Sequence, residues 1–183
     1  VHLWLPEGPD RPWRPGGAQR AHLPGGFTME RMLPMMDEAG VDRAVIVPPS
    51  WEGERNDVCL AAARETPKRF AVMGRLDVDA PESRGRIAAW RTQPGMLGLR
   101  FTMHRPLLRP VLTEGRIDWL WPEAEKALKR SVELNDKFAH GYTALGALYN
   151  RQGKPAEARP LLQRSVDLEP KSWQAHFELA QCL

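Results

Sequence analysis

Residues 123–134, EAEKALKRSVEL, recur 34 positions later as residues 157–168, EARPLLQRSVDL. The two segments share Glu, Ala, Leu, Arg, Ser, Val and Leu at matching positions. Self-similarity at a fixed spacing of this size is the signature of a helical repeat, in which each unit stacks on the next. The spacing therefore predicts that the C-terminal third of the chain is all-α.

The 34-residue unit resembles the tetratricopeptide repeat (TPR). The residues that carry the resemblance lie on two antiparallel helices and just after them: Tyr142, Leu145, Gly146, Tyr149, Ala158, Leu162 and Pro170. Small residues let the two helices cross closely, and a proline cannot continue the second helix. We expect four helices, over residues 123–134, 139–151, 155–168 and 172–183, so that one whole repeat is flanked by two halves.

The half repeat at the start has no expected first helix. That helix would fall on residues 105–115, where Pro106 and Pro110 oppose helix formation. The array also ends inside a helix, so we expect the apolar side chains of Trp173, Phe177 and Leu179 to lack a covering helix.

The resemblance implies a concave groove, lined by the first helix of each repeat, that binds peptides or partner helices. The groove-facing positions in this chain are His140, Thr143, Ala147, Asn150 and Arg151. The Lys and Asn pair that clamps a C-terminal carboxylate in some members is missing, so a ligand of that kind is not expected. The alternative is four generic amphipathic helices whose similarity to the repeat is accidental.

The first hundred residues alternate short apolar runs with helical stretches, which predicts βα units around a parallel sheet. We expect strands over residues 1–5, 44–47, 70–76 and 97–101, and helices over residues 29–39, 57–65 and 84–92. Thr28 is the expected cap of the first helix, and Gly40 its end. Residues 6–26, rich in Pro and Gly, form a long loop after the first strand.

Five short motifs follow one another through this region: residues 1–4 (VHLW), 36–45 (MDEAGVDRAV), 69–70 (RF), 98–101 (GLRF) and 118–121 (DWLW). In their order and spacing they resemble the amidohydrolase-related, metal-dependent hydrolases, which have a TIM-barrel fold. The resemblance covers about 120 residues. It is strongest to the branch that hydrolyses pyrone dicarboxylates and related lactones.

This second resemblance implies roles for two residues. The first strand of the family ends in His-x-His, and His2 matches the second histidine, which implies a metal-binding role. Arg100 would bind a substrate carboxylate as a bidentate donor. A lone histidine at a chain end is more often an inert surface group than a ligand, so that is the favoured interpretation of His2, and Arg100 fits a structural ion pair equally well.

The barrel is expected to be incomplete, because a TIM barrel needs eight strands and the helical repeats follow the fourth. The later strands that supply another histidine and the catalytic aspartate are missing. We therefore assign no catalytic residue and expect no cofactor in this chain. A divalent metal such as Zn or Mn would be expected only with a complete barrel.

Composition places a domain boundary near residue 122, because fourteen of the seventeen prolines lie at or before Pro122. The expected domains are residues 1–122 and 123–183. A net charge of +3 without a basic cluster argues against nucleic acid, and no apolar run is long enough for a membrane span. The two cysteines, Cys59 and Cys182, fall in different domains, which favours a reducing, cytoplasmic compartment.

The predicted fold is an α/β half-barrel of three βα units plus a fourth strand, followed by all-α TPR hairpins. The favoured function is a protein-binding module that takes a protein or peptide through the TPR groove, on a platform that is not an active enzyme. The alternative is a metal-dependent hydrolase acting on a carboxylated lactone or amide. We also expect self-association, because an open sheet edge and an uncovered helix face both favour a partner.

Overall fold

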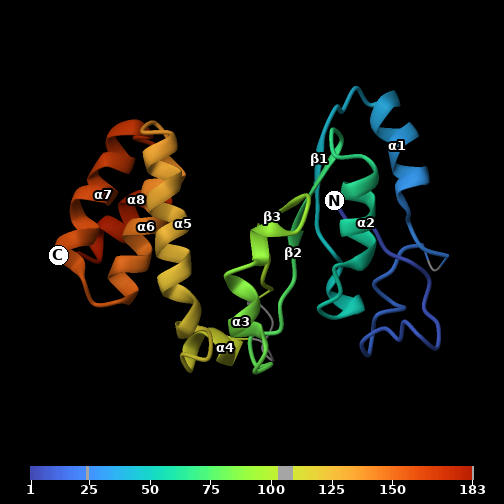
Figure 1. Cartoon of the computed structure of the whole chain (residues 1–183). Helices are drawn as coiled ribbons and strands as arrows, with labels where there is room; N and C mark the ends of the chain where they lie inside the picture. Colours follow the sequence, from blue (N-terminus) through green and yellow to red (C-terminus); the bar gives the residue numbers. More distant parts are fainter. Residues whose placement is uncertain (24, 103–108, 183) are drawn as a thin grey trace. The chain divides into compact units, whose positions relative to one another are not determined.

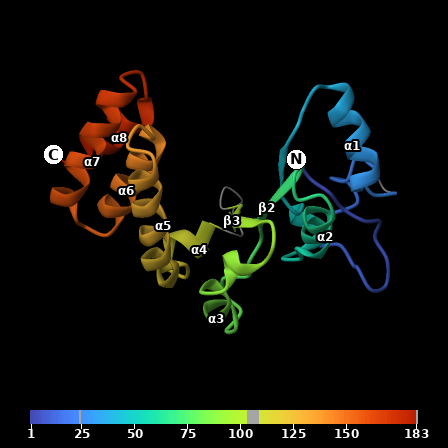
Figure 2. The same cartoon turned by 45° about the horizontal axis from the view of Figure 1, so that its top comes forward.

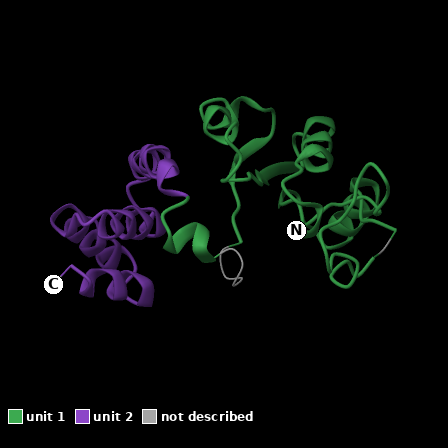
Figure 3. Ribbon diagram, turned by 90° about the horizontal axis from the view of Figure 1, so that it is seen from below, with its two compact units in different colours: residues 1–116 green, residues 117–183 purple. Residues whose placement is uncertain are grey.

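The computed structural model describes residues 1–23, 25–102 and 109–182. They form two compact units, Val1–Arg116 and Ile117–Leu183 (Figure 3). Pro122, where the composition changes, lies in the first turn of a helix of the second unit. A proline is tolerated there because the first helical N–H groups have no intrahelical partner.

A three-stranded parallel sheet organises the first unit (Figure 1). Its strands are β1 (Ala44–Ile46), β2 (Phe70–Gly74) and β3 (Met96–Leu99), in the order β1-β2-β3. Ala44 pairs with Phe70, and Val72 with Met96. Phe70, Val72 and Gly74 are buried on one face of β2, which helix α2 (Asp57–Glu65) contacts with its own buried side chains.

The first unit has five further helices besides α2 among its described residues. They are α1 (Met29–Glu38), η1 (Ser50–Glu52), α3 (Ser83–Ile87), η2 (Trp90–Thr92) and α4 (Arg109–Thr113). Helix α1 ends as predicted, because Gly40 adopts a left-handed conformation with φ of 65°. Thr28 occupies the N-cap position, but its side chain makes no capping hydrogen bond.

The expected first strand, residues 1–5, is not a strand of the sheet. Trp4 instead forms an isolated antiparallel bridge with Phe27, with N···O distances of 3.0 and 2.9 Å. The N–H of Leu5 points to the carboxylate of Glu52 at 3.4 Å. The carbonyl of Val1 accepts from the Val47 N–H at 2.8 Å, next to β1, but from Trp4 onward the backbone groups bond to these other partners. No continuous strand therefore forms, and the described residues contain three strands, not four. Such a small sheet is common to many α/β folds, and the half-barrel stays a prediction.

Two helix predictions also need correction. The single helix expected over residues 84–92 is broken into α3 and η2, and the Nε1 of Trp90 donates to the Gly98 carbonyl at 3.0 Å, which fixes η2 against β3. Helix α4 forms where two prolines were expected to prevent it. Pro110 is its second residue, where no intrahelical N–H is needed. Pro106 lies outside the described residues.

The second unit is a stack of helices, which lie side by side in both Figure 1 and Figure 2. After the short η3 (Asp118–Leu120) come α5 (Trp121–Leu134), α6 (Ala139–Arg151), α7 (Pro155–Leu168) and α8 (Trp173–Ala180). The predicted bounds of α6 and α7 are confirmed. Helix α8 is shorter than expected, starting after Ser172, whose side chain accepts from the Ala175 N–H at 3.4 Å; Leu183 lies outside the described residues.

The core of this unit lies where α6 crosses α7. Leu145, Tyr149, Ala158 and Leu162 form one buried cluster, and the last two are fully buried. Leu179 packs against this cluster, so the prediction that it would be uncovered is wrong: it lies on the inner side of α8.

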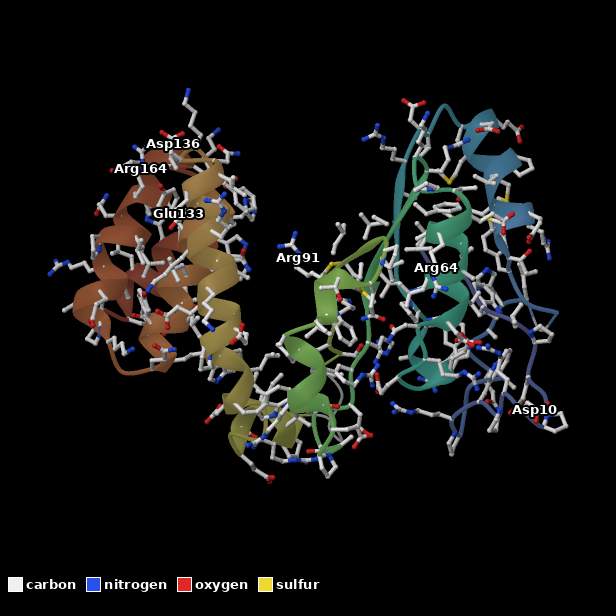
Figure 4. The ribbon with its side chains drawn as sticks, in the orientation of Figure 1. Asp10, Arg64, Arg91, Glu133, Asp136 and Arg164 are labelled. Carbon is white, nitrogen blue, oxygen red and sulfur yellow. The ribbon has the colours of Figure 1, made fainter. Side chains whose placement is uncertain are left out.

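The turn between α5 and α6 is also tied to α7. Nη2 of Arg164 donates to the carbonyl of Asp136 at 3.4 Å, and Figure 4 shows the two residues at the same end of the stack. Ser165 is buried and donates to the Ala139 carbonyl at 2.9 Å. The first of these bonds joins the turn after the half repeat to the whole repeat, and the second holds α6 and α7 of the whole repeat together.

Candidate functional site

The five predicted groove residues lie on one side of α6, with the core residues Leu145 and Tyr149 on the other, as helical spacing requires. They differ in exposure. His140 and Arg151, at the two ends of the helix, are exposed, and Thr143, Ala147 and Asn150 are half-buried. The site is therefore a narrow strip with small side chains in the middle and nitrogen-bearing ones at the ends.

Two of the five side chains are used inside the stack. The hydroxyl of Thr143 lies 2.7 Å from that of Ser165 on α7. The amide of Asn150 donates to the carbonyl of Glu178 on α8 at 2.8 Å and to its carboxylate at 3.2 Å. Thr143 and Asn150 thus hold α6 against its neighbours, and the side chains left for a ligand are His140, Ala147 and Arg151.

The two end residues differ in their partners. The Nδ1 of His140 is 3.5 Å from a carboxylate oxygen of Glu169, an ion pair only when the ring is protonated. Within the described ranges, no carboxylate lies at ion-pair distance from Arg151. Its guanidinium can therefore take an acidic group from a ligand.

Helix α8 carries two exposed aromatic side chains that were not among the predicted groove residues. Trp173 is 73% exposed and Phe177 is 58% exposed. They lie one turn apart on the same side of α8, away from buried Ala175. Exposed aromatic residues on a recognition surface are typical anchors for a partner.

In the first unit, His2 lies beside the carboxyl end of β1. Its Nδ1 is 2.6 Å from the carbonyl of Val47, so this nitrogen is the donor and Nε2 is left with a lone pair. Partial burial lowers the pKa of His2, and the nearby charges of Arg75 and Arg100 act in the same direction. The ring is therefore neutral near neutral pH.

Arg75 and Arg100 follow β2 and β3 directly, at the same edge of the sheet. Arg100 is exposed, and its N–H donates to the Gly74 carbonyl at 2.8 Å. Arg75 is only 5% exposed, and its Nε donates to Glu54 at 3.2 Å. Burial lowers the pKa of Arg75, against the attraction of Glu54.

Sequence reasoning missed Arg75, because the strand predicted over residues 70–76 ran past it, whereas β2 ends at Gly74; a charged residue near the end of an apolar strand was a usable signal. Its backbone N–H and carbonyl both bond to the side-chain amide of Asn56, at 2.7 and 2.9 Å. The structure thus brings His2, Arg75 and Arg100 to one edge. In the part of the chain that is described, no group of three or more His, Cys, Asp or Glu side chains could hold a metal ion.

Comparison with known families supports the predicted helical repeat in the second unit. The family model for the tetratricopeptide repeat matches residues 139–182, which span α6, α7 and α8. No curated protein and no solved structure is detectably similar to the chain. Among the residues described, no helix has the length and apolar character needed to cross a membrane.

Proposed function

We propose that this protein is a protein-binding module that holds a peptide against the exposed side of α6 and the neighbouring side of α8. The observation that carries the proposal is the match of residues 139–182 to the tetratricopeptide repeat, because repeats of this kind present their first helices to ligands. Helix α6 is the first helix of the whole repeat, and its outer side is free of the core.

The exposed side chains of α6 and α8 indicate which residue types the bound peptide should contain. Ala147 leaves room for a ligand backbone or an apolar side chain, since its own side chain is one methyl group. Arg151 supplies an unpaired cation for a carboxylate. Trp173 and Phe177 supply apolar area from α8. The ligand is therefore a peptide segment with apolar residues and at least one acidic residue.

The test is a selection of random displayed peptides against the whole chain, followed by affinity measurements by fluorescence anisotropy. Arg151→Glu should weaken a selected peptide by about ten-fold or more, since it reverses the charge offered to the ligand. Arg159→Glu is the matched control, because Arg159 is an exposed arginine on α7, the second helix. Equal effects of the two variants would contradict the placement of the site.

A second candidate function is a metal-dependent hydrolase of the amidohydrolase-related family, acting on a carboxylated lactone or amide. One observation favours it. The Nδ1 of His2 donates to a backbone carbonyl, the arrangement that orients a metal-binding imidazole through its other nitrogen. Arg100 at the same edge would hold the substrate carboxylate.

We rank the hydrolase second because one histidine cannot replace a ligand set drawn from several strands. The purified protein should contain no stoichiometric Zn or Mn and should not hydrolyse a panel of carboxylated lactones. Elemental analysis and the lactone panel measure this together. A bound metal whose removal abolishes turnover would reverse the ranking.

A further inference from the structure

A long irregular segment, residues 6–23, is attached to the turn before α2; we call it the strap. Pro24, which follows it, lies outside the described residues. The N–H of Arg14 donates to the carbonyl of Trp51 at 2.7 Å, and Nη1 of Arg55 donates to the carbonyl of Asp10 at 2.9 Å. Figure 4 shows Asp10 on this segment. The strand ladders contain no strap residue, so these attachments do not depend on the sheet.

Ion pairs fasten the strap at two points. Arg11 bridges two carboxylates, with Nη1 at 3.0 Å from Glu52 and Nη2 at 2.5 Å from Asp57. The side chain of Glu52 is 2% exposed and that of Arg11 is 12% exposed. The pair of Arg14 with Glu54, at 2.9 Å, is more exposed. A buried carboxylate that loses its cation is strongly disfavoured, so removing Arg11 favours the conformation in which Glu52 reaches water.

An aromatic cluster lies beneath the fastening. Trp13 of the strap and Trp51 of η1 belong to one buried cluster with Trp4 and Ala21. The indole N–H groups of Trp13 and Trp51 are buried, with no hydrogen-bond acceptor among the described residues. Burying a donor without an acceptor costs free energy, and opening the strap removes this cost. The ion pairs thus stabilise the closed strap, whereas the two buried indole N–H groups without an acceptor destabilise it.

The strap also fits closely over Trp51. A Cβ added at Gly17 would lie 2.9 Å from the Cβ of Trp13, 3.0 Å from the Cβ of Trp51 and 2.9 Å from the carbonyl oxygen of Arg14. These atoms belong to the backbone or to the base of a side chain and cannot move freely. A residue larger than glycine must therefore push the strap away from Trp51 or distort the strap's own turn at Trp13 and Arg14.

We propose that the strap is a lid, latched by the Arg11 and Arg14 ion pairs, that opens as a unit and uncovers the aromatic cluster formed with Trp4 and Trp51. The ring of Trp51 is 5.6 Å from that of Trp4 and 6.3 Å from that of Trp13. Opening separates Trp13 from Trp51, and the layer of α2 and β2 stays folded.

Hydrogen–deuterium exchange on the whole chain tests the proposal, with the strap peptide that contains Arg14 as the reporter. Arg11→Gln removes the positive charge that pairs with Glu52 and Asp57. Gly17→Ala adds a methyl group that crowds Trp13 and Trp51 and leaves the charge unchanged. Each has a matched control in the same unit. Arg116→Gln breaks the exposed Arg116–Asp79 pair, and Gly85→Ala adds a Cβ where no atom lies within 4 Å.

In both test variants, strap exchange should rise by roughly ten-fold, and that of α2 and β2 should stay within about two-fold of the unchanged protein. Three results would overturn the lid: unchanged strap exchange in both variants, equal acceleration of α2 and β2, or an equal effect of the controls.

Discussion

Replacing Gly146 of α6 with alanine tests the packing on which the helical repeat depends. A Cβ at this position would lie 2.4 Å from Cγ and 2.6 Å from Cδ2 of Leu162 on α7. Leu162 is fully buried and belongs to the cluster with Leu145 and Tyr149, so it has little room to move. We therefore expect Gly146→Ala to destabilise the repeat, although alanine is the better helix former.

The magnitude follows from two opposing effects. Overpacking a core costs typically about 1–3 kcal/mol. Helix propensity returns about 1 kcal/mol when glycine becomes alanine, so the net cost of Gly146→Ala should be about 0–2 kcal/mol. Leu162→Ala alone should cost about 2–5 kcal/mol, because it leaves a cavity. In the double variant the alanine methyl group enters that cavity. The two changes together should therefore cost less than their sum by roughly 1–3 kcal/mol.

The assay is urea unfolding followed by far-UV circular dichroism, with the free energy of unfolding taken from the linear dependence on urea. Gly85→Ala combined with Leu162→Ala is the control, since Gly85 lies in the other unit and no atom lies near its added Cβ. This control pair should be additive. A coupling energy below about 0.5 kcal/mol between Gly146→Ala and Leu162→Ala would refute the reasoning.

Three further predictions concern other parts of the chain. Leu145→Ala should cost about 2–5 kcal/mol and Arg100→Ala no more than about 0.5 kcal/mol, because only Leu145 is buried; similar melting shifts would count against this. Burial raises the pKa of the Cys59 thiol from 9.0 to about 12. The stability that the buried neutral thiol contributes should therefore be constant below pH 9 and be lost as the pH rises from 9 toward 12. Unfolding free energies that do not fall over this pH range would contradict the prediction. Finally, exposed Trp173 and Phe177 should promote self-association, measured by light scattering, whereas a mass near 20.7 kDa at all concentrations would argue against it.

The helical repeat could be predicted closely because its signals are local. The resemblance to the 34-residue repeat predicted the bounds of α6 and α7 to the residue, and Gly146 and Ala158 marked the crossing. The contacts of Asn150 could not be read in the same way. Its amide bonds to Glu178, and that pairing appears only when α8 folds against α6.

The first unit was less predictable because its decisive contacts join distant residues. Residues 1–5 have the composition of a strand, but Trp4 pairs with Phe27 and leaves the parallel ladder. The sequence predicted a loop where the strap lies. It could not predict the ion pair between Arg11 and Glu52, because the two residues are 41 positions apart and no sequence pattern links them. Long-range pairing of this kind overrides local propensity.

The most direct test of the proposed protein-binding function is an amide NMR titration of the whole chain with a selected peptide. We predict that the largest shift changes will fall on Ala147 and Arg151 of α6 and on Phe177 of α8, while Gln163 and Asp167 on α7 stay unchanged. Largest changes on α7 or in the first unit, or no changes at saturation, would contradict the account.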